Sequence, residues 1–204
     1  KNKSNKILKN ISINYVELDE NQNKISTKQV PVEISLKRDE KALIKIIPQN
    51  YTYTIDIIGY SYETEDYNVN VDLNENTANI EKLSNLEEKQ KELEDMLKYD
   101  ILEIYDFKGI DDTSYKVKIK NNSQKNLGNI ILKVAEKNSD GEYISVSNIS
   151  NNSTLKAKDF SALMLNSTDK ENTLEIIGYT YDDIENKSNI DIDLKTNTAS
   201  IVRN

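Results

Sequence analysis

Two short tyrosine stretches carry the side chains best suited to recognising a partner. The sequence Ile57-Ile58-Gly59-Tyr60-Ser61-Tyr62 returns as Ile176-Ile177-Gly178-Tyr179-Thr180-Tyr181. Successive side chains of a β-strand point to opposite faces, so alternate positions in each stretch share a face. If that face is exposed, it forms an apolar and aromatic stripe that could bind a protein or a cell-wall glycan. The stripe consists of Ile58, Tyr60, Tyr62, Ile177, Tyr179 and Tyr181.

Burial of the same tyrosines is the alternative, and we favour it. A bulge at Gly59 and Gly178 would reverse the alternation and turn the tyrosines into a core. A strand covered on both faces would give the same pattern. The tyrosines therefore belong either to a binding surface or to the interior of a sheet structure.

Catalytic chemistry has few candidate residues in this chain. It contains no His and no Cys, which excludes thiolate catalysis, disulfides and Cys-based zinc sites and removes the best ligands for transition metals. A pair of carboxylates suffices for a glycosidase, but the acidic residues are spread through turns and a connecting segment, where periodicity predicts no burial. Five glycines in the whole chain leave no glycine-rich phosphate loop. We predict no catalytic residue and no cofactor, with a carboxylate-based hydrolase as an alternative.

Two acidic turns at equivalent positions, residues 19–23 and 138–142, offer oxygen ligands of the kind that calcium prefers. Neither has the glycine and the distant bidentate Glu of an EF-hand loop. Asn and Asp stabilise turns through their own side chains, so we interpret both stretches as hairpin turns and predict no metal site.

The net charge of −8 at pH 7 disfavours nucleic acid and anionic membrane surfaces as partners, because both require an excess of Lys and Arg. The chain has no apolar run long enough for a transmembrane helix. We predict no nucleic-acid binding and no membrane insertion of this segment. Its oligomeric state is left open.

The elements that position the tyrosines are duplicated. Gly59 and Gly178 are 119 positions apart, and the same offset relates Asn2 to Asn121 and Leu36 to Leu155. Beyond residue 183 the offset becomes 121, as for Leu73 and Leu194. The chain therefore contains a domain-sized duplication. We divide it into repeat 1 at residues 1–81, a linker at 82–99 and repeat 2 at 100–204.

Short alternating runs separated by polar turns predict an all-β fold, with two tandem sandwich domains of immunoglobulin or fibronectin III type. In repeat 1, Ala42, Ile44 and Ile46 predict a strand that ends before Pro48, and Pro31 marks another strand as an edge or a bulge. Repeat 2 is predicted to have strands at Ile130–Ala135, Tyr143–Ser147, Ser161–Leu165, Thr173–Tyr181 and Ile190–Leu194.

One amphipathic helix is predicted between the repeats, from Ser84 to Lys98. Ser84 is a suitable N-cap with Glu87 three positions later. Leucines spaced three and four apart form a single stripe. This helix serves either as a spacer packed on a sandwich, which we favour, or as a short coiled-coil seam between two chains.

Repeat 2 begins with two strands, at Ile101–Phe107 and Tyr115–Ile119, that have no counterpart ahead of Lys1. Without them a sandwich exposes unpaired strand edges and an open core. We expect an upstream segment to complete repeat 1. A strand from a neighbouring chain or a smaller, rearranged first domain are the alternatives.

Part of repeat 2 resembles the FxLYD-type immunoglobulin-like repeats of bacterial envelope proteins. The resemblance rests on the strand Val117–Ile119 followed by Asn121-Asn122-Ser123, on the strand Ile130–Val134, and on the turn Asp140-Gly141. It covers about a third of each repeat, and the family's Phe-x-Leu-Tyr-Asp signature is absent near Val134–Asn138. The resemblance implies a β-sandwich in an exported or lipid-anchored protein and brings no active site.

The function predicted from these observations is that of a non-catalytic extracellular or cell-envelope module of a Gram-positive bacterium, acting as a spacer or protein-binding repeat. A carbohydrate-binding module that uses the outward tyrosines is the alternative, and a carboxylate-based hydrolase is the second alternative.

Overall fold

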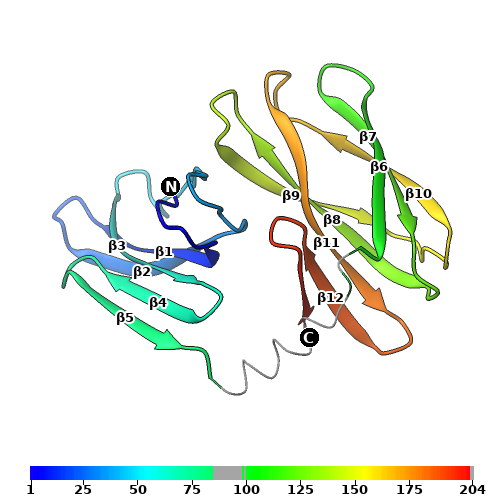
Figure 1. The fold of residues 1–204 in the computed structure, drawn as a ribbon. Helices are drawn as coiled ribbons and strands as arrows, with labels where there is room; N and C mark the ends of the chain where they lie inside the picture. The colour runs from blue at the N-terminus through cyan, green and yellow to red at the C-terminus, as the bar shows by residue number, and fades with distance from the viewer. Residues whose placement is uncertain (85–97, 99, 203–204) are drawn as a thin grey trace. The chain divides into compact units, whose positions relative to one another are not determined.

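The structure is a computed structural model that describes residues 1–84, 98 and 100–202. The chain divides into two compact units, Lys1–Asn85 and Leu86–Asn204, here called unit 1 and unit 2. The regular elements of the described residues are all β-strands in antiparallel sheets (Figure 1), which confirms the predicted all-β class. The helix predicted from Ser84 to Lys98 falls almost entirely on residues 85–97, which lie outside the described residues.

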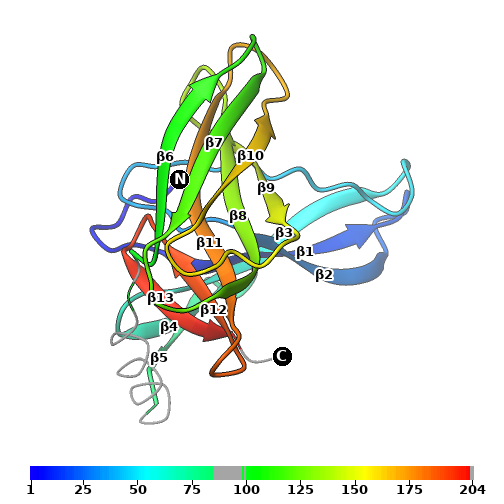
Figure 2. The same cartoon turned by 90° about the vertical axis from the view of Figure 1, so that its right-hand side faces the viewer.

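Unit 2 is built from two sheets that pack face to face as a sandwich (Figures 1 and 2). The smaller sheet has the order β10-β7-β6 and the larger one the order β13-β12-β11-β8-β9. Their strands are β6 (Leu102–Gly109), β7 (Ser114–Asn121), β8 (Leu127–Lys137), β9 (Tyr143–Asn151), β10 (Phe160–Asn166), β11 (Thr173–Asp183), β12 (Ser188–Asp193) and β13 (Thr198–Val202). Alternate side chains of both sheets meet in one core that includes Val117, Ile119, Leu132, Leu165, Tyr179 and Ile192.

Unit 1 consists of a single five-stranded sheet in its described residues, with the order β2-β1-β3-β4-β5. The strands are β1 (Lys9–Leu18), β2 (Lys24–Val32), β3 (Thr54–Glu63), β4 (Tyr67–Asp72) and β5 (Thr77–Lys82). This order repeats that of β9-β8-β11-β12-β13, so the sequence duplication corresponds to a duplicated sheet. The predicted sandwich is thus present in unit 2, whereas the described residues of unit 1 form only one of its two layers.

The strand predicted at Ala42–Ile46 is not formed, because residues 43–47 join no sheet among the described residues. Their repeat partners belong to β10, which pairs with β7, and the described part of unit 1 has no equivalent of β7. The alternating pattern in this stretch was therefore correct, but a strand also needs a neighbour to accept its hydrogen bonds. Pro31 does lie in β2, an edge strand of the sheet, as predicted.

A bulge interrupts β3 and β11 at equivalent places. The β11–β8 ladder shifts register between Ile176 and Gly178, and the β1–β3 ladder shifts where Asn14 pairs with Gly59 and Tyr15 with Ile57. At Gly178 an added Cβ would lie 2.4 Å from the Ile192 carbonyl oxygen, and at Gly59 it would lie 2.4 Å from that of Val71. Only glycine fits such a close backbone approach. The predicted bulge at both glycines is confirmed.

Candidate functional site

The tyrosines of the repeated stretch are interior residues in unit 2. Tyr179 is 0% exposed, Tyr181 3% and Ile177 5%. The Leu102 amide, at the start of β6, donates a hydrogen bond to the Tyr179 hydroxyl at 3.1 Å. Tyr179 thereby ties the larger sheet to the smaller one. The outward orientation considered for Tyr179 and Tyr181 is wrong, because the bulge at Gly178 reverses the alternation and places both rings in the core. Ile177, at the bulge, is buried as well but is not among the core residues shared by the two sheets.

Burial also raises the pKa of both phenols further above their ordinary value of 10. Burial raises the pKa of Tyr179 to about 12, against a smaller lowering by the hydrogen bond from Leu102. The pKa of Tyr181 is likewise raised by burial and by the neighbouring Tyr179. Both side chains therefore stay neutral and contribute packing, with their ring centroids 6.3 Å apart.

The equivalent side chains of unit 1, Ile58, Tyr60 and Tyr62, are only half-buried. The rings of Tyr60 and Tyr62 stack with centroids 6.3 Å apart, the same spacing as in unit 2. For the two tyrosines the difference in burial follows from the missing layer, because nothing equivalent to β6 and β7 lies over this sheet in the described residues. We call the unit 1 residues whose repeat partners pack in the unit 2 core the open face: Ile11, Ile13, Tyr15, Tyr60, Tyr62, Val69, Val71, Ala78 and Ile80. Within this set Ile11, Tyr15 and Val69 are buried, and the other six side chains are half-buried or exposed.

Each unit also buries a glutamate, which periodicity did not predict. Glu136 is 4% exposed in β8. Its Oε1 accepts hydrogen bonds from the Ser167 hydroxyl at 2.8 Å, from the amide and hydroxyl of Thr168 at 2.7 Å each, and from the Asn172 side-chain amide at 2.8 Å. Burial raises the pKa of Glu136, but these hydrogen bonds outweigh it and lower the pKa to about 2.

Glu17 is the repeat partner of Glu136 and is 0% exposed. The Ser26 hydroxyl donates to it at 2.8 Å, Lys28 Nζ at 3.0 Å and the Gln49 amide at 3.0 Å. Ser26 and Gln49 occupy the positions of Ser145 and Thr168, which both donate to Glu136. Burial opposes ionisation, but the hydrogen bonds from Lys28 and Ser26 lower the pKa of Glu17 overall.

Both glutamates hold a loop to the sheet and have no free side for a substrate. Each carboxylate is surrounded by donors from its own unit, and the loop amide at Gln49 or Thr168 is one of them. A buried carboxylate that satisfies several donors fixes the backbone that supplies them. The shared offset between Glu17 and Glu136 was the one sequence signal for this arrangement.

Unit 2 has a second cluster of polar side chains, around Tyr143 at the start of β9. The Tyr143 hydroxyl accepts a hydrogen bond from Lys195 Nζ at 2.8 Å and donates one to Glu175 Oε2 at 2.9 Å. Lys137 pairs with Glu175 at 2.7 Å. Burial opposes ionisation of Glu175, but the hydrogen bonds from Lys137 and Tyr143 lower its pKa overall. The repeat partner of Tyr143 in unit 1 is Lys24, so this cluster is specific to unit 2.

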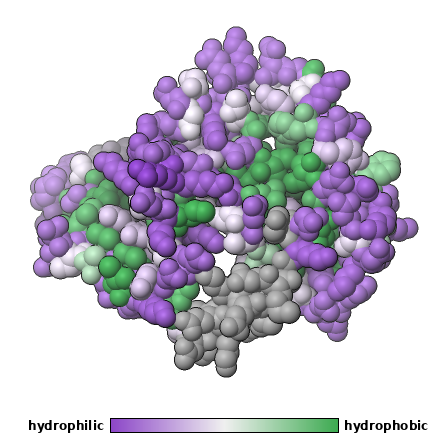
Figure 3. Space-filling view, in the orientation of Figure 1, coloured by the Kyte–Doolittle hydropathy of each residue, from purple (hydrophilic) through white to green (hydrophobic). Residues whose placement is uncertain are grey.

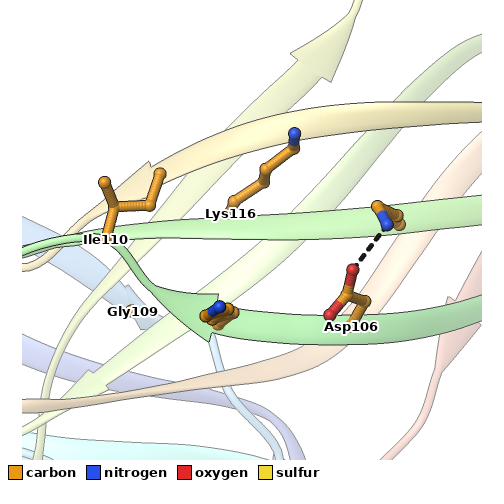
Figure 4. A pocket seen from close by; sticks show the side chains of 6 residues that line it. Asp106, Gly109, Ile110 and Lys116 are labelled. Carbon is orange, nitrogen blue, oxygen red and sulfur yellow. Dashed lines mark ion pairs between the residues drawn. The ribbon is translucent and has the colours of Figure 1, made fainter.

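A shallow pocket of about 440 Å³ lies on the hairpin of β6 and β7 (Figure 4). Lys118 pairs with Asp106 across it at 2.6 Å, and this hydrogen bond and charge lower the pKa of Asp106. Most of the lining side chains are exposed, so the pocket offers neither burial nor a second carboxylate. The lining residues are Asp106, Lys108, Gly109, Ile110, Lys116 and Lys118.

The two acidic turns adopt the hairpin geometry that was predicted. Asp19 Oδ1 accepts the amides of Asn21 and Asn23 at 2.9 and 2.8 Å, and these bonds lower the pKa of Asp19. Asn138 Oδ1 accepts the amides of Asp140 and Glu142 at 3.1 and 2.9 Å. The described residues contain no cluster of three acidic side chains placed to hold a metal ion.

Two further findings bear on the sequence predictions. Within the described ranges no helix has the length and apolar character needed to cross a membrane. Comparison with known proteins gives no matching family model and no matching curated protein.

Proposed function

We propose that the chain is a non-catalytic repeat module that acts as a spacer or a protein-binding repeat. The observation that carries the proposal is that the buried carboxylate of each repeat, Glu17 or Glu136, is occupied by hydrogen bonds that hold the fold together. Glu17 and Glu136 each accept bonds from a serine on the neighbouring strand and from a loop amide. Carboxylates committed to the same scaffold contacts in both copies are unsuited to acid–base catalysis, which needs a group within reach of a substrate.

We further propose that the module belongs to the immunoglobulin or fibronectin III type and acts outside the cell or in the envelope of a Gram-positive bacterium. The arrangement of β6 to β13 in two antiparallel sheets supports the fold type. The FxLYD resemblance supports the location. Its Asn-rich turn follows β7 and its Asp-Gly turn joins β8 to β9.

Surface digestion tests the proposed location. Intact host cells are treated with a protease that does not enter them, and the chain is followed with an antibody. A chain on the cell surface is cut before a cytosolic marker is released. Recovery of uncut chain together with that marker would exclude an envelope location.

Glycan binding is a second candidate and rests on unit 1 alone. Tyr60 and Tyr62 are half-buried and stacked, so part of each ring reaches solvent, whereas their partners in unit 2 do not. On a glycan array, Tyr60→Ala should abolish binding and Tyr179→Ala should act only through the stability of unit 2. An array without signal for the unsubstituted chain would remove this candidate.

A further inference from the structure

The open face of unit 1 has the apolar side chains of a sandwich core, but the described residues form no second sheet over it. Three of its nine side chains, Ile11, Tyr15 and Val69, are buried all the same, so the uncovered part consists of the other six. In unit 2, Leu132 and Ile192 are 0% exposed beneath the smaller sheet. Their repeat partners Ile13 and Val71 are half-buried, and Ile80 at the edge is 62% exposed. Figure 3 shows apolar side chains at the visible surface over the sheet of unit 1. Apolar surface gathered on one face of a sheet indicates a docking surface.

Residues 43–47 supply one edge of a second layer. Their repeat partners lie in β10, in which Leu163 and Leu165 point into the core and pair in register with Val117 and Tyr115 of β7. Ile44 and Ile46 are half-buried in the same alternation, while Leu43 and Ile47 are 52% and 64% exposed. This stretch therefore has the pattern of β10 without its neighbouring strand.

Asn2 makes the same hydrogen bonds as Asn121, the residue that ends β7 in unit 2. Asn121 is the last residue of β7, and its amide donates to the Asp159 carbonyl at 3.0 Å. The Asn2 amide donates to the Glu40 carbonyl at the same 3.0 Å. The side chains of Asn2 and Asn121 make equivalent hydrogen bonds. The Asn2 side-chain amide donates to the carbonyl oxygens of Lys6 and Leu36, and that of Asn121 donates to those of Lys125 and Leu155. A strand that leads into Asn2 would therefore run antiparallel to residues 43–47, as β7 runs beside β10.

We propose that the exposed part of the open face of unit 1 is the docking site of a two-stranded β-hairpin of the β6–β7 kind, which enters directly ahead of Asn2 and pairs with residues 43–47. The hairpin presents alternating branched apolar side chains to the sheet, as Val117 and Ile119 do at 0% exposure. Its other face is polar, as Lys116 and Lys118 are in β7.

A second copy of unit 1 fits the site less well. Two open faces could stack, but stacking supplies no strand that ends at Asn2, and it leaves the amides of residues 43–47 without a ladder. A docked hairpin would bury the apolar side chains of the open face and also provide hydrogen-bonding partners for the backbone of residues 43–47. The inference concerns this surface only and is independent of the proposed location. It excludes glycan binding at Tyr60 and Tyr62 while the hairpin is docked, because both rings belong to the covered face.

The test uses the hairpin that the chain itself contains. Residues 100–119 are fused directly ahead of Lys1 in the full chain, in the covalent order of unit 2. We expect amide exchange at residues 43–47 to slow about tenfold or more, because a ladder amide exchanges only when the sheet opens. The rings of Tyr60 and Tyr62 should also become protected from nitration. Unit 2 amides report whether the rest of the fused chain is folded.

Two matched variants of the added hairpin separate docking from mere attachment. Val117→Asp with Ile119→Asp in the added copy should abolish both effects, because it places charges against the open face. Lys116→Ser with Lys118→Ser changes the outer face and should leave both effects in place.

Three results would overturn the proposal. One is unchanged exchange at residues 43–47 in a fused chain whose unit 2 is folded. Another is equal protection by the aspartate variant. The third is found with the unfused chain. If it sediments as a dimer, and if the amides of residues 43–47 and the ring of Tyr60 are already protected, a second copy covers the face. If the fused chain does not fold, a peptide of residues 100–119 is added to the unmodified chain, and unshifted resonances of Tyr60 and Tyr62 at saturating peptide contradict the proposal.

Discussion

The buried glutamates link single side chains to the pH at which the fold is stable. Glu136 has an ordinary pKa of 4.5 that is lowered to about 2 in the folded chain. A group whose pKa is lowered by folding adds stability above its unfolded pKa and loses that contribution as the pH falls toward the folded value. The contribution of Glu136 is therefore complete at neutral pH and disappears between about pH 4.5 and pH 2.

Replacement of this carboxylate tests the argument. Glu136→Gln should lower the free energy of unfolding of unit 2 by about 1–3 kcal/mol at pH 7, the usual effect of losing hydrogen bonds to a buried charge. The deficit should shrink as the pH approaches 2, because the unsubstituted carboxyl is then protonated as well. Urea unfolding at several pH values measures it. Glu171→Gln, an exposed acid of the same loop, controls for the lost charge, and a deficit independent of pH would contradict the assigned role.

A second residue-scale prediction concerns the hydroxyl of Tyr179. Tyr179→Phe keeps the ring but removes the acceptor of the buried Leu102 amide, and an unpaired buried donor costs about 1–3 kcal/mol. Tyr60→Phe makes the same change at the half-buried equivalent in unit 1 and should alter stability by less than about 0.5 kcal/mol. Equal losses in the two variants, measured by urea unfolding, would show that the Leu102 contact does not stabilise unit 2.

At the scale of elements, the repeated glycine sets the orientation of the tyrosines. A Cβ at Gly178 would meet the Ile192 carbonyl oxygen at 2.4 Å, so Gly178→Ala must displace β12 from β11. We expect a loss of about 1–3 kcal/mol from overpacking and altered resonances of Tyr179. Gly109→Ala is the control, because the nearest atom to an added Cβ there lies at 3.8 Å. Unchanged Tyr179 resonances in a folded Gly178→Ala variant would exclude this role of the glycine.

Strand patterns were predictable from the sequence where each strand has its neighbour within the same unit. Val117 and Ile119 alternate and lie in β7, and the bulge alternative at Gly178 gave the correct face for Tyr179. Ile44 and Ile46 alternate equally well but form no strand, because periodicity reports the face of a side chain and not the presence of a hydrogen-bonding neighbour.

The candidate site was less predictable, for two physical reasons. Side chains at Tyr60 and Tyr179 are identical, yet one is half-buried and the other fully buried, because burial depends on what covers the sheet. Glu17 and Glu136 are buried charged residues, which no hydrophobic period marks. Both are stabilised by donors distant in sequence, such as Gln49 and Thr168. Only comparison of the two repeats could have pointed to them.

At the scale of the whole molecule, the two units differ in how much apolar surface they bury. Among the described residues, unit 1 has six buried apolar side chains and unit 2 has eighteen. Fully burying one large aliphatic side chain contributes about 1.5–3 kcal/mol. The smaller core should therefore make unit 1 much less stable, and we expect two separate unfolding transitions with unit 1 first.

Amide spectra recorded along a urea series can assign the two transitions, with Ile13 and Val71 reporting unit 1 and Leu132 and Ile192 reporting unit 2. Glu136→Gln should move only the later transition, and Ile13→Ala only the earlier one. The Ile13→Ala loss should stay below the 2–5 kcal/mol typical of a fully buried isoleucine, because Ile13 is half-buried, whereas Leu132→Ala should reach that range. Coincident loss of all four signals would mean that the units unfold as one, and the stability of unit 1 would then come from contacts beyond its own sheet.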